Sequence, residues 1–166
     1  MPEPTANHQA DTATQTIRFG GETLLLLPDK AVLWPAKKIL LVADTHFGKG
    51  GVFREAGVAI PTGTTANDLQ RLNRLIDRYR PAQLIVLGDF LPGKPTEQVI
   101  RQIAEWRKTL SCSVLVVRGN HDRHLKTVPE QWHDIHFLPD LKIGPITLQH
   151  EPVVYQPEAL KLSDAL

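Results

Sequence analysis

The sequence predicts an α/β fold built around a largely parallel sheet. Apolar runs rich in β-branched residues, at 39–43, 84–87 and 114–117, have the length and composition of buried strands. Segments with apolar residues at helical spacing separate these runs, which favours helices layered on the sheet. Each run is followed directly by polar side chains that can bind metals. In open α/β sheets such residues converge on one crevice, so we expect a functional site there.

The chain begins with a polar segment rich in threonine and alanine. We expect residues 1–15 to form a disordered arm and residues 16–166 to form one domain. Three short strands follow at about 16–19, 22–27 and 31–34. Gly20-Gly21 and Pro28-Asp29 interrupt them, a pattern typical of hairpins.

Two helices are predicted between the three buried strands. Gly48, Gly50 and Gly51 indicate an irregular loop, after which the threonines of 62–65 offer hydroxyl N-caps to a helix that ends near Tyr79. Its buried face is formed by Leu69, Leu72, Leu75, Ile76 and Tyr79. A second helix is predicted over about 96–110. Strands at 135–138 and 146–148 complete the predicted elements.

Composition limits the possible functions. With 166 residues, 42% of them hydrophobic, the chain can bury one core. Nineteen lysines and arginines against eighteen acids leave a net charge of +1, so no global basic field attracts nucleic acid. The single cysteine, Cys112, is interpreted as a small core residue. No apolar run is long enough to span a bilayer and no signal sequence is evident, so we expect a soluble, cytoplasmic protein that does not bind membranes.

The residues that follow the predicted strands form an ordered series of oxygen and imidazole ligands. The series is Asp44-Thr45-His46, Gly88-Asp89, Gly119-Asn120-His121-Asp122 and His150. In the third group, asparagine supplies a carbonyl oxygen, histidine a titratable ring, and aspartate an acceptor that can fix the ring's tautomer. A ligand set of oxygen and nitrogen without thiolate suits Mn²⁺, which we favour, or Fe or Zn²⁺.

This ordered series resembles the calcineurin-like metallophosphoesterase superfamily. Within that superfamily, several segments resemble the bacterial ligase-associated DNA-repair endonucleases and phosphodiesterases. They are Gly21-Glu22-Thr23-Leu24, Trp34-Pro35-Ala36, Leu41 to Lys49, Gly88-Asp89-Phe90-Leu91 and His150-Glu151-Pro152. The resemblance implies a four-layer αββα metallophosphoesterase sandwich. It also implies a metal-dependent hydrolase of phosphodiesters, with DNA as substrate and a DNA ligase and other repair proteins as partners.

The resemblance implies roles for these residues as well. Two divalent ions activate a water molecule, with Asp44 and His46 on the first ion, Asp89 bridging both, and Asn120 and His150 on the second. His121 would protonate or stabilise the leaving oxygen, and Asp122 would orient its ring; both are predicted catalytic residues. Four cations in or beside the site loops could bind phosphate oxygens or equally be solvated surface charges: Lys49, Arg54, Arg118 and Arg123.

The sequence departs from the superfamily pattern after His150. The late Gly-His-x-His motif, which gives each metal a further histidine, is absent, and residues 151–166 contain no histidine. The chain therefore reads as carboxy-terminally truncated, with its last strands missing. Two alternatives to a DNA phosphodiesterase stay open at this point. One is a catalytically impaired remnant that acts only as a binding module, and the other is a hydrolase of small nucleotide phosphoesters.

Overall fold

A seven-stranded mixed sheet forms the centre of the computed structural model, which describes residues 14–59, 61 and 63–152. The strands follow chain order across the sheet: β1 (Gln15–Phe19), β2 (Glu22–Leu27), β3 (Ala31–Trp34), β4 (Ile39–Ala43), β5 (Gln83–Leu87), β6 (Ser113–Val117) and β7 (Ile135–Leu138). Strands β1 to β4 pair antiparallel, and β4 to β7 pair parallel. The predicted arm lies outside the described residues up to position 13, and Gln15 already belongs to β1.

The register of the first antiparallel hairpin is set by its turn. Phe19 pairs with Glu22, which leaves Gly20 and Gly21 as a two-residue loop with φ of 57° and 80°. Positive φ at both positions is typical of a type I′ turn, whose twist matches that of the flanking strands. The glycine pair therefore fixes the register of the first hairpin.

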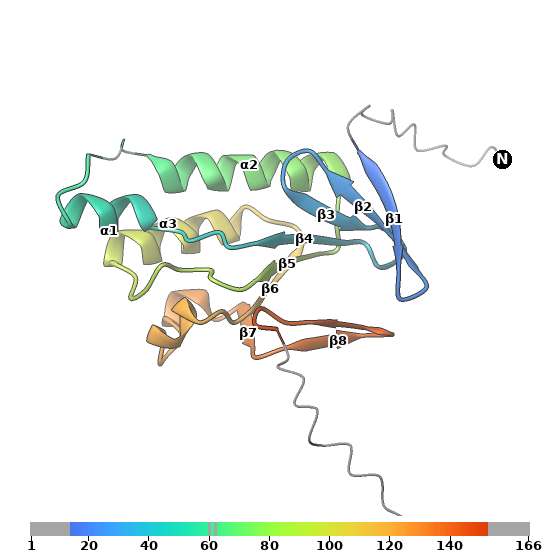
Figure 1. The fold of residues 1–166 in the computed structure, drawn as a ribbon. Coiled ribbons are helices and arrows are strands. Elements are labelled where there is room, and N and C mark those ends of the chain that lie inside the picture. The colour runs from blue at the N-terminus through green and yellow to red at the C-terminus, as the bar shows by residue number, and fades with distance from the viewer. Residues whose placement is uncertain (1–13, 60, 62, 153–166) are drawn as a thin grey trace, which may run out of the picture.

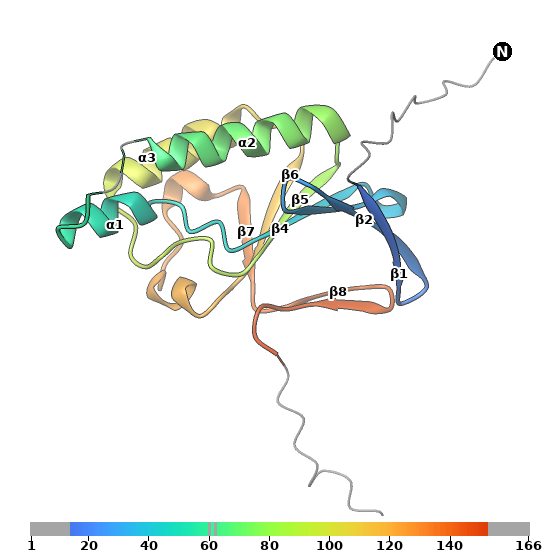
Figure 2. The ribbon, with the colours of Figure 1, turned by 45° about the horizontal axis from the view of Figure 1, so that its top comes forward.

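Helices cover one face of the sheet, and a small hairpin covers the other (Figures 1 and 2). The helices are α1 (Lys49–Glu55), α2 (Thr64–Tyr79) and α3 (Glu97–Lys108), and the hairpin consists of β8 (Leu141–Ile143) and β9 (Ile146–Leu148). Three short 3₁₀ helices are η1 (Pro35–Lys37), η2 (His121–His124) and η3 (Glu130–Trp132). The predicted α/β class is confirmed, since these layers correspond to the α, β and β layers of the expected sandwich.

Both faces of the parallel strands are buried, which explains their continuous apolar runs. Leu40 and Val42 of β4 belong to the core under the helices, together with Leu72 of α2. Ile39 and Leu41 alternate with them and belong to a second core, which the β8–β9 hairpin closes. Because successive side chains of a strand point to opposite faces, one strand contributes to both cores.

Two local predictions were wrong. The glycine-rich segment predicted to be an irregular loop contains α1, which begins at Lys49. The hydroxyl N-cap predicted for α2 is replaced by Gly63 in a left-handed conformation with φ of 85°, and Thr65 Oγ1 instead accepts a hydrogen bond of 3.0 Å from Gly48 N. In both cases contacts made between distant segments outweighed local propensity.

Cys112 is buried, as predicted for a small core residue. Burial raises the pKa of its thiol, although hydrogen bonds from the backbone and the charge of Arg107 act in the opposite direction. Among the described residues, no helix combines the length and apolar character that crossing a membrane requires.

The core under the helices should depend strongly on Leu72, which has no exposed surface. Leu72→Ala is expected to lower the free energy of unfolding by about 2–5 kcal/mol because it leaves a cavity. Urea denaturation followed by circular dichroism measures this change. The exposed Gln70→Ala on the same helix is the control, and an equal effect of both substitutions would contradict this description of the core.

Candidate metal centre

Asp89 lies at the centre of the predicted site. Its carboxylate is buried, with 6% of the residue exposed, just beyond the end of β5. The Nε2 atoms of His46 and His121 lie 3.4 and 3.9 Å from Asp89 Oδ2, and Nε2 of His150 lies 3.7 Å from Oδ1. Three imidazoles from three different loops thus surround one carboxylate.

The ligand atoms form two groups that share Asp89. His46, Asp89 and His121 make the first, and Asp44, Asp89 and His150 make the second; within each group the atoms lie within 4.8 Å of one another. His150 Nδ1 lies 3.6 Å from Asp44 Oδ1. A carboxylate common to two such groups is the arrangement that a pair of metal ions bridged by one ligand requires.

Asn120 extends the second group. Its Oδ1 lies 3.2 Å from Nε2 of His150, so the two predicted ligands of one ion are neighbours. Asp44 and His46 were predicted to bind the other ion together, but they fall in different groups. Asp44 lies with His150, whereas His46 lies with His121. The assignment of each residue to a particular ion therefore stays a prediction.

A backbone carbonyl fixes the ring of His46. Its Nδ1 lies 3.0 Å from the carbonyl oxygen of Asp44, and because a carbonyl only accepts, Nδ1 carries the proton. In the neutral form of the ring, Nε2, which lies on the side of Asp89, has the free lone pair. This is the tautomer that a metal ligand needs.

The backbone around the site is strained. Asp44, His46 and Asp89 have φ of 50°, 44° and 42°, values that residues other than glycine rarely adopt. Hydrogen bonds between the strand-exit loops hold these conformations, from Asp44 N to Gly88 O and from His46 N to Asp89 O, at 3.3 and 2.9 Å. The parallel pairing of β4 and β5 thus continues past the strands and aligns their polar residues.

Two aromatic side chains tie these loops to the core. Phe47 and Phe90 directly follow His46 and Asp89, are almost fully buried, and contact each other edge to face at 5.2 Å between ring centroids. Phe47 N also donates a hydrogen bond of 2.9 Å to Phe90 O. His46 and Asp89 are therefore each followed by an aromatic residue that fixes the position of its loop.

Two glycines of the predicted motifs are required because other site residues lie too close to them to leave room for a side chain. A Cβ atom at Gly88 would overlap the ring of His150, and one at Gly119 would overlap the carboxylate and backbone nitrogen of Asp89. Only glycine lets these segments approach so closely. The Gly-Asp and Gly-Asn-His-Asp motifs thus carry a steric requirement in addition to their ligands.

Asp122 binds backbone amides of two site loops. Its carboxylate has no exposed surface and accepts hydrogen bonds from the backbone N–H groups of Phe90, Leu91 and Gly119, at 3.2, 3.0 and 2.8 Å. No hydrogen bond joins it to the ring of His121 among the described residues, and its orientation of this ring stays a prediction. Both its oxygens are used by backbone amides, and it holds the Asp89 loop against the Asn120 loop.

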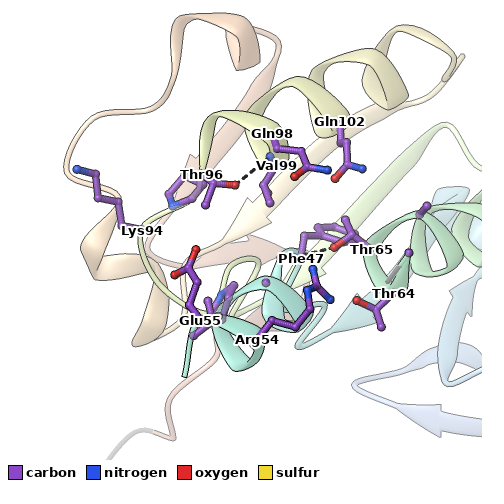
Figure 3. A pocket seen from close by; sticks show the side chains of 17 residues that line it. Phe47, Arg54, Glu55, Thr64, Thr65, Lys94, Thr96, Gln98, Val99 and Gln102 are labelled. Carbon is purple, nitrogen blue, oxygen red and sulfur yellow. Dashed lines mark hydrogen bonds between the residues drawn. The ribbon is translucent and has the colours of Figure 1, made fainter. Parts of the chain in front are cut away.

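The four predicted phosphate-binding cations lie in different surroundings. Lys49 borders a cavity that Asp44 and His46 also line. Arg54 donates to Pro61 O at 3.2 Å and lines a separate cavity next to the first turns of α2 and α3 (Figure 3). Arg118 donates to Leu125 O at 3.1 Å and lies over the ring of Phe137, and Arg123 pairs with Glu151 at 2.9 Å. Lys49 thus lines the same cavity as two predicted metal ligands.

The donor set fits divalent metal ions. Within the described residues, no lysine or arginine pairs with the buried Asp89 carboxylate, whose near neighbours are imidazoles and the backbone N–H of His121 at 3.0 Å. A buried carboxylate is costly unless positive charge compensates it. Bound cations would supply that charge, and the mixed carboxylate, amide and imidazole ligands suit Mn²⁺, Fe or Zn²⁺.

Substitution at Gly119 should disturb the site through Asp89. Gly119→Ala is expected to weaken Mn²⁺ binding at least about tenfold, because the added methyl group forces the carboxylate to move. Isothermal titration calorimetry measures the affinity. Gly93→Ala is a matched control, since a Cβ atom there meets nothing within 4 Å. Unchanged affinity in the Gly119 variant would contradict the geometry described here.

Removing the Asp122 carboxylate should lower stability even without metal. Asp122→Ala leaves three buried amides without an acceptor and is expected to cost about 3 kcal/mol or more. Chemical denaturation in the presence of EDTA measures this cost. The control is Asp77→Ala, at an exposed position of α2. A variant of near wild-type stability would show that the carboxylate does not hold the two loops.

Comparison with known proteins agrees with this geometry. A family model described as calcineurin-like phosphoesterase matches residues 37–159. Among solved structures, the chain is similar to the nuclease MPE of Pseudomonas putida, with 39% identity and a TM-score of 0.64 over 75% of this chain; it spans 59% of the length of that chain. A search of curated proteins found no significant match. Because the family model covers well over half of the sequence, this chain belongs to the calcineurin-like phosphoesterase family.

Proposed function

We propose that this protein is a metal-dependent phosphodiesterase that hydrolyses DNA, with two divalent ions, Mn²⁺ by preference, as its cofactors. The observation that carries the proposal is the buried carboxylate of Asp89, which two groups of ligand atoms share. Similarity to a nuclease supports nucleic acid as the substrate. A DNA ligase and other repair proteins as partners form a further part of the proposal, supported by the family resemblance.

The chain's own residues would have separate tasks. Five side chains would hold the ions: Asp44, His46, Asp89, Asn120 and His150. Divalent ions held there would supply two effects: a lower pKa of an attacking water molecule and compensation of the charge that develops on the phosphate. Asp122 keeps the Asp89 and Asn120 loops together through three backbone amides, so that the ligands stay aligned.

His121 is the proposed general acid. Its side chain is 48% exposed, and Nε2 lies on the side of Asp89. The ring also meets His46 edge to face, with 5.6 Å between the ring centroids. A partly exposed imidazole at the rim of the site can reach the leaving oxygen of a substrate and donate a proton to it.

Substitution of the shared carboxylate tests the proposal. Asp89→Asn is expected to reduce Mn²⁺-dependent hydrolysis of bis-p-nitrophenyl phosphate by more than about a hundredfold, since the bridging negative charge is lost. The release of p-nitrophenol measures the rate, and Asp77→Asn on the surface of α2 is the control.

Equal rates for wild type and Asp89→Asn would remove Asp89 from the reaction. Absence of turnover by the wild type with Mn²⁺, Fe²⁺ and Zn²⁺ would overturn the proposal, and calorimetry would then show whether metal still binds. A panel of single-stranded DNA, cyclic nucleotides and nucleotide diphosphates distinguishes a DNA phosphodiesterase from a hydrolase of small nucleotides.

A further inference from the structure

A cavity of about 410 Å³ lies directly beside the predicted metal ligands Asp44 and His46. Its walls come from four parts of the chain: the turn between β2 and β3, the end of β4 with the loop that follows it, the helix α1, and the first half of α2. The volume falls within the range of about 300–1,000 Å³ that is usual for small-ligand sites. The cavity therefore has room for a group attached to a phosphodiester that occupies the metal centre.

An aromatic ring borders this cavity. Phe53 of α1 lines it and is 38% exposed, which is unusual for a phenylalanine. Lys49 precedes Phe53 by one helical turn, and its ammonium lies over the ring at 5.6 Å from the centroid. The two side chains thus present a flat apolar surface next to a positive charge.

The aromatic ring has a fixed relation to the metal centre. Lys49 N donates a hydrogen bond of 3.0 Å to the carbonyl oxygen of His46, so α1 begins directly at a predicted metal ligand. Gly48 N is held in turn by Thr65 Oγ1 of α2 at 3.0 Å. Through these bonds, Phe53 is positioned by the same backbone that positions His46.

The charges around the cavity favour an anion. Lys30, Lys49 and Arg71 line it, and Asp68 is the one carboxylate of its lining that does not belong to the predicted metal groups. Arg71 Nη1 donates to the carbonyl oxygen of Asp29, which anchors the guanidinium while its other N–H groups can still bind phosphate. Because the net charge of the chain is only +1, this attraction is local.

We infer that this cavity binds an unpaired nucleotide of the substrate strand, next to the phosphodiester that is cleaved. The base stacks on Phe53, and the adjoining phosphate is bound by Lys30 and Arg71. A ring beside several cations is the combination by which proteins bind single strands, since every base offers an aromatic face and every linkage a negative charge. In a duplex, neighbouring bases cover that face. This inference rests on the proposed function, because it assigns a substrate to the same site.

Binding without turnover tests the inference. The probe is a short fluorescein-labelled oligothymidylate with phosphorothioate linkages, which resist hydrolysis, and fluorescence anisotropy is measured on the Mn²⁺-loaded full chain. Phe53→Ala is expected to raise the dissociation constant roughly five- to hundredfold, the range for loss of one stacked base. Phe53→Trp should bind at least as tightly as wild type, whereas Phe53→Leu should be as weak as Phe53→Ala because it keeps apolar volume but has no ring.

Matched controls separate the cavity from the general surface. Phe19→Ala removes another exposed phenylalanine, on β1, and should not change the affinity. Lys30→Gln and Arg71→Gln should each reduce the slope of log affinity against log salt by about 0.7, as expected for one phosphate contact on a single strand. Lys142→Gln on β8 should leave the slope unchanged. Thermal melting of each variant verifies that it is folded.

Three results would overturn the inference: no binding of the oligonucleotide by the wild type, equal affinities of wild type and Phe53→Ala, or equal affinities for the strand and for a duplex of the same length. None of them depends on catalysis. If Asp89→Asn and wild type hydrolyse the small phosphodiester equally but Phe53→Ala still weakens strand binding, the proposed function fails and the nucleotide site stands. If instead Asp89→Asn hydrolyses the small phosphodiester much more slowly than wild type but Phe53→Ala binds the strand as tightly as wild type, the protein is a phosphodiesterase whose substrate does not use this cavity.

Discussion

The burial of the Asp89 carboxylate among three imidazole rings is the constraint on which the rest of the structure depends. A carboxylate that is 6% exposed is costly unless nearby groups compensate its charge. Within the described residues, the backbone N–H of His121 supplies part of this compensation by donating a hydrogen bond of 3.0 Å to Oδ1. The remaining need for positive charge is what makes the site suitable for divalent cations.

The fold supports this constraint with backbone hydrogen bonds and aromatic packing. Parallel pairing of β4 with β5 and of β5 with β6 brings three strand-exit loops to one edge of the sheet. Beyond the strand ends, the Asp122 carboxylate joins two of these loops, because it accepts hydrogen bonds from three of their backbone amides. Phe47 and Phe90 then anchor the same loops in the core, so site geometry and stability depend on the same residues.

Electrostatics in this protein are local. A net charge of +1 gives no long-range attraction for nucleic acid, and the cations near the site have separate tasks. Arg118 and Arg123 are engaged with a carbonyl and a carboxylate of neighbouring segments, whereas Lys49 borders the cavity beside the predicted ligands. Attraction of an anionic ligand to such a protein must come from the few cations that lie close to the site.

The sequence by itself determined the order of β1 to β7 with α2 and α3 between them, and the metal-binding residue types at the strand ends, but neither α1 nor β8. Apolar periodicity is a local property, and the exit of a buried strand is a local position, so both can be read along the chain. The tertiary structure decided that His150, carried after the β8–β9 hairpin, meets Asp44. It also decided that Asp122 binds backbone amides, and that glycine-rich 49–55 is helical. The contacts of Asp122 with Phe90 and of His150 with Asp44 join positions 32 and 106 residues apart, a separation that local propensity does not encode.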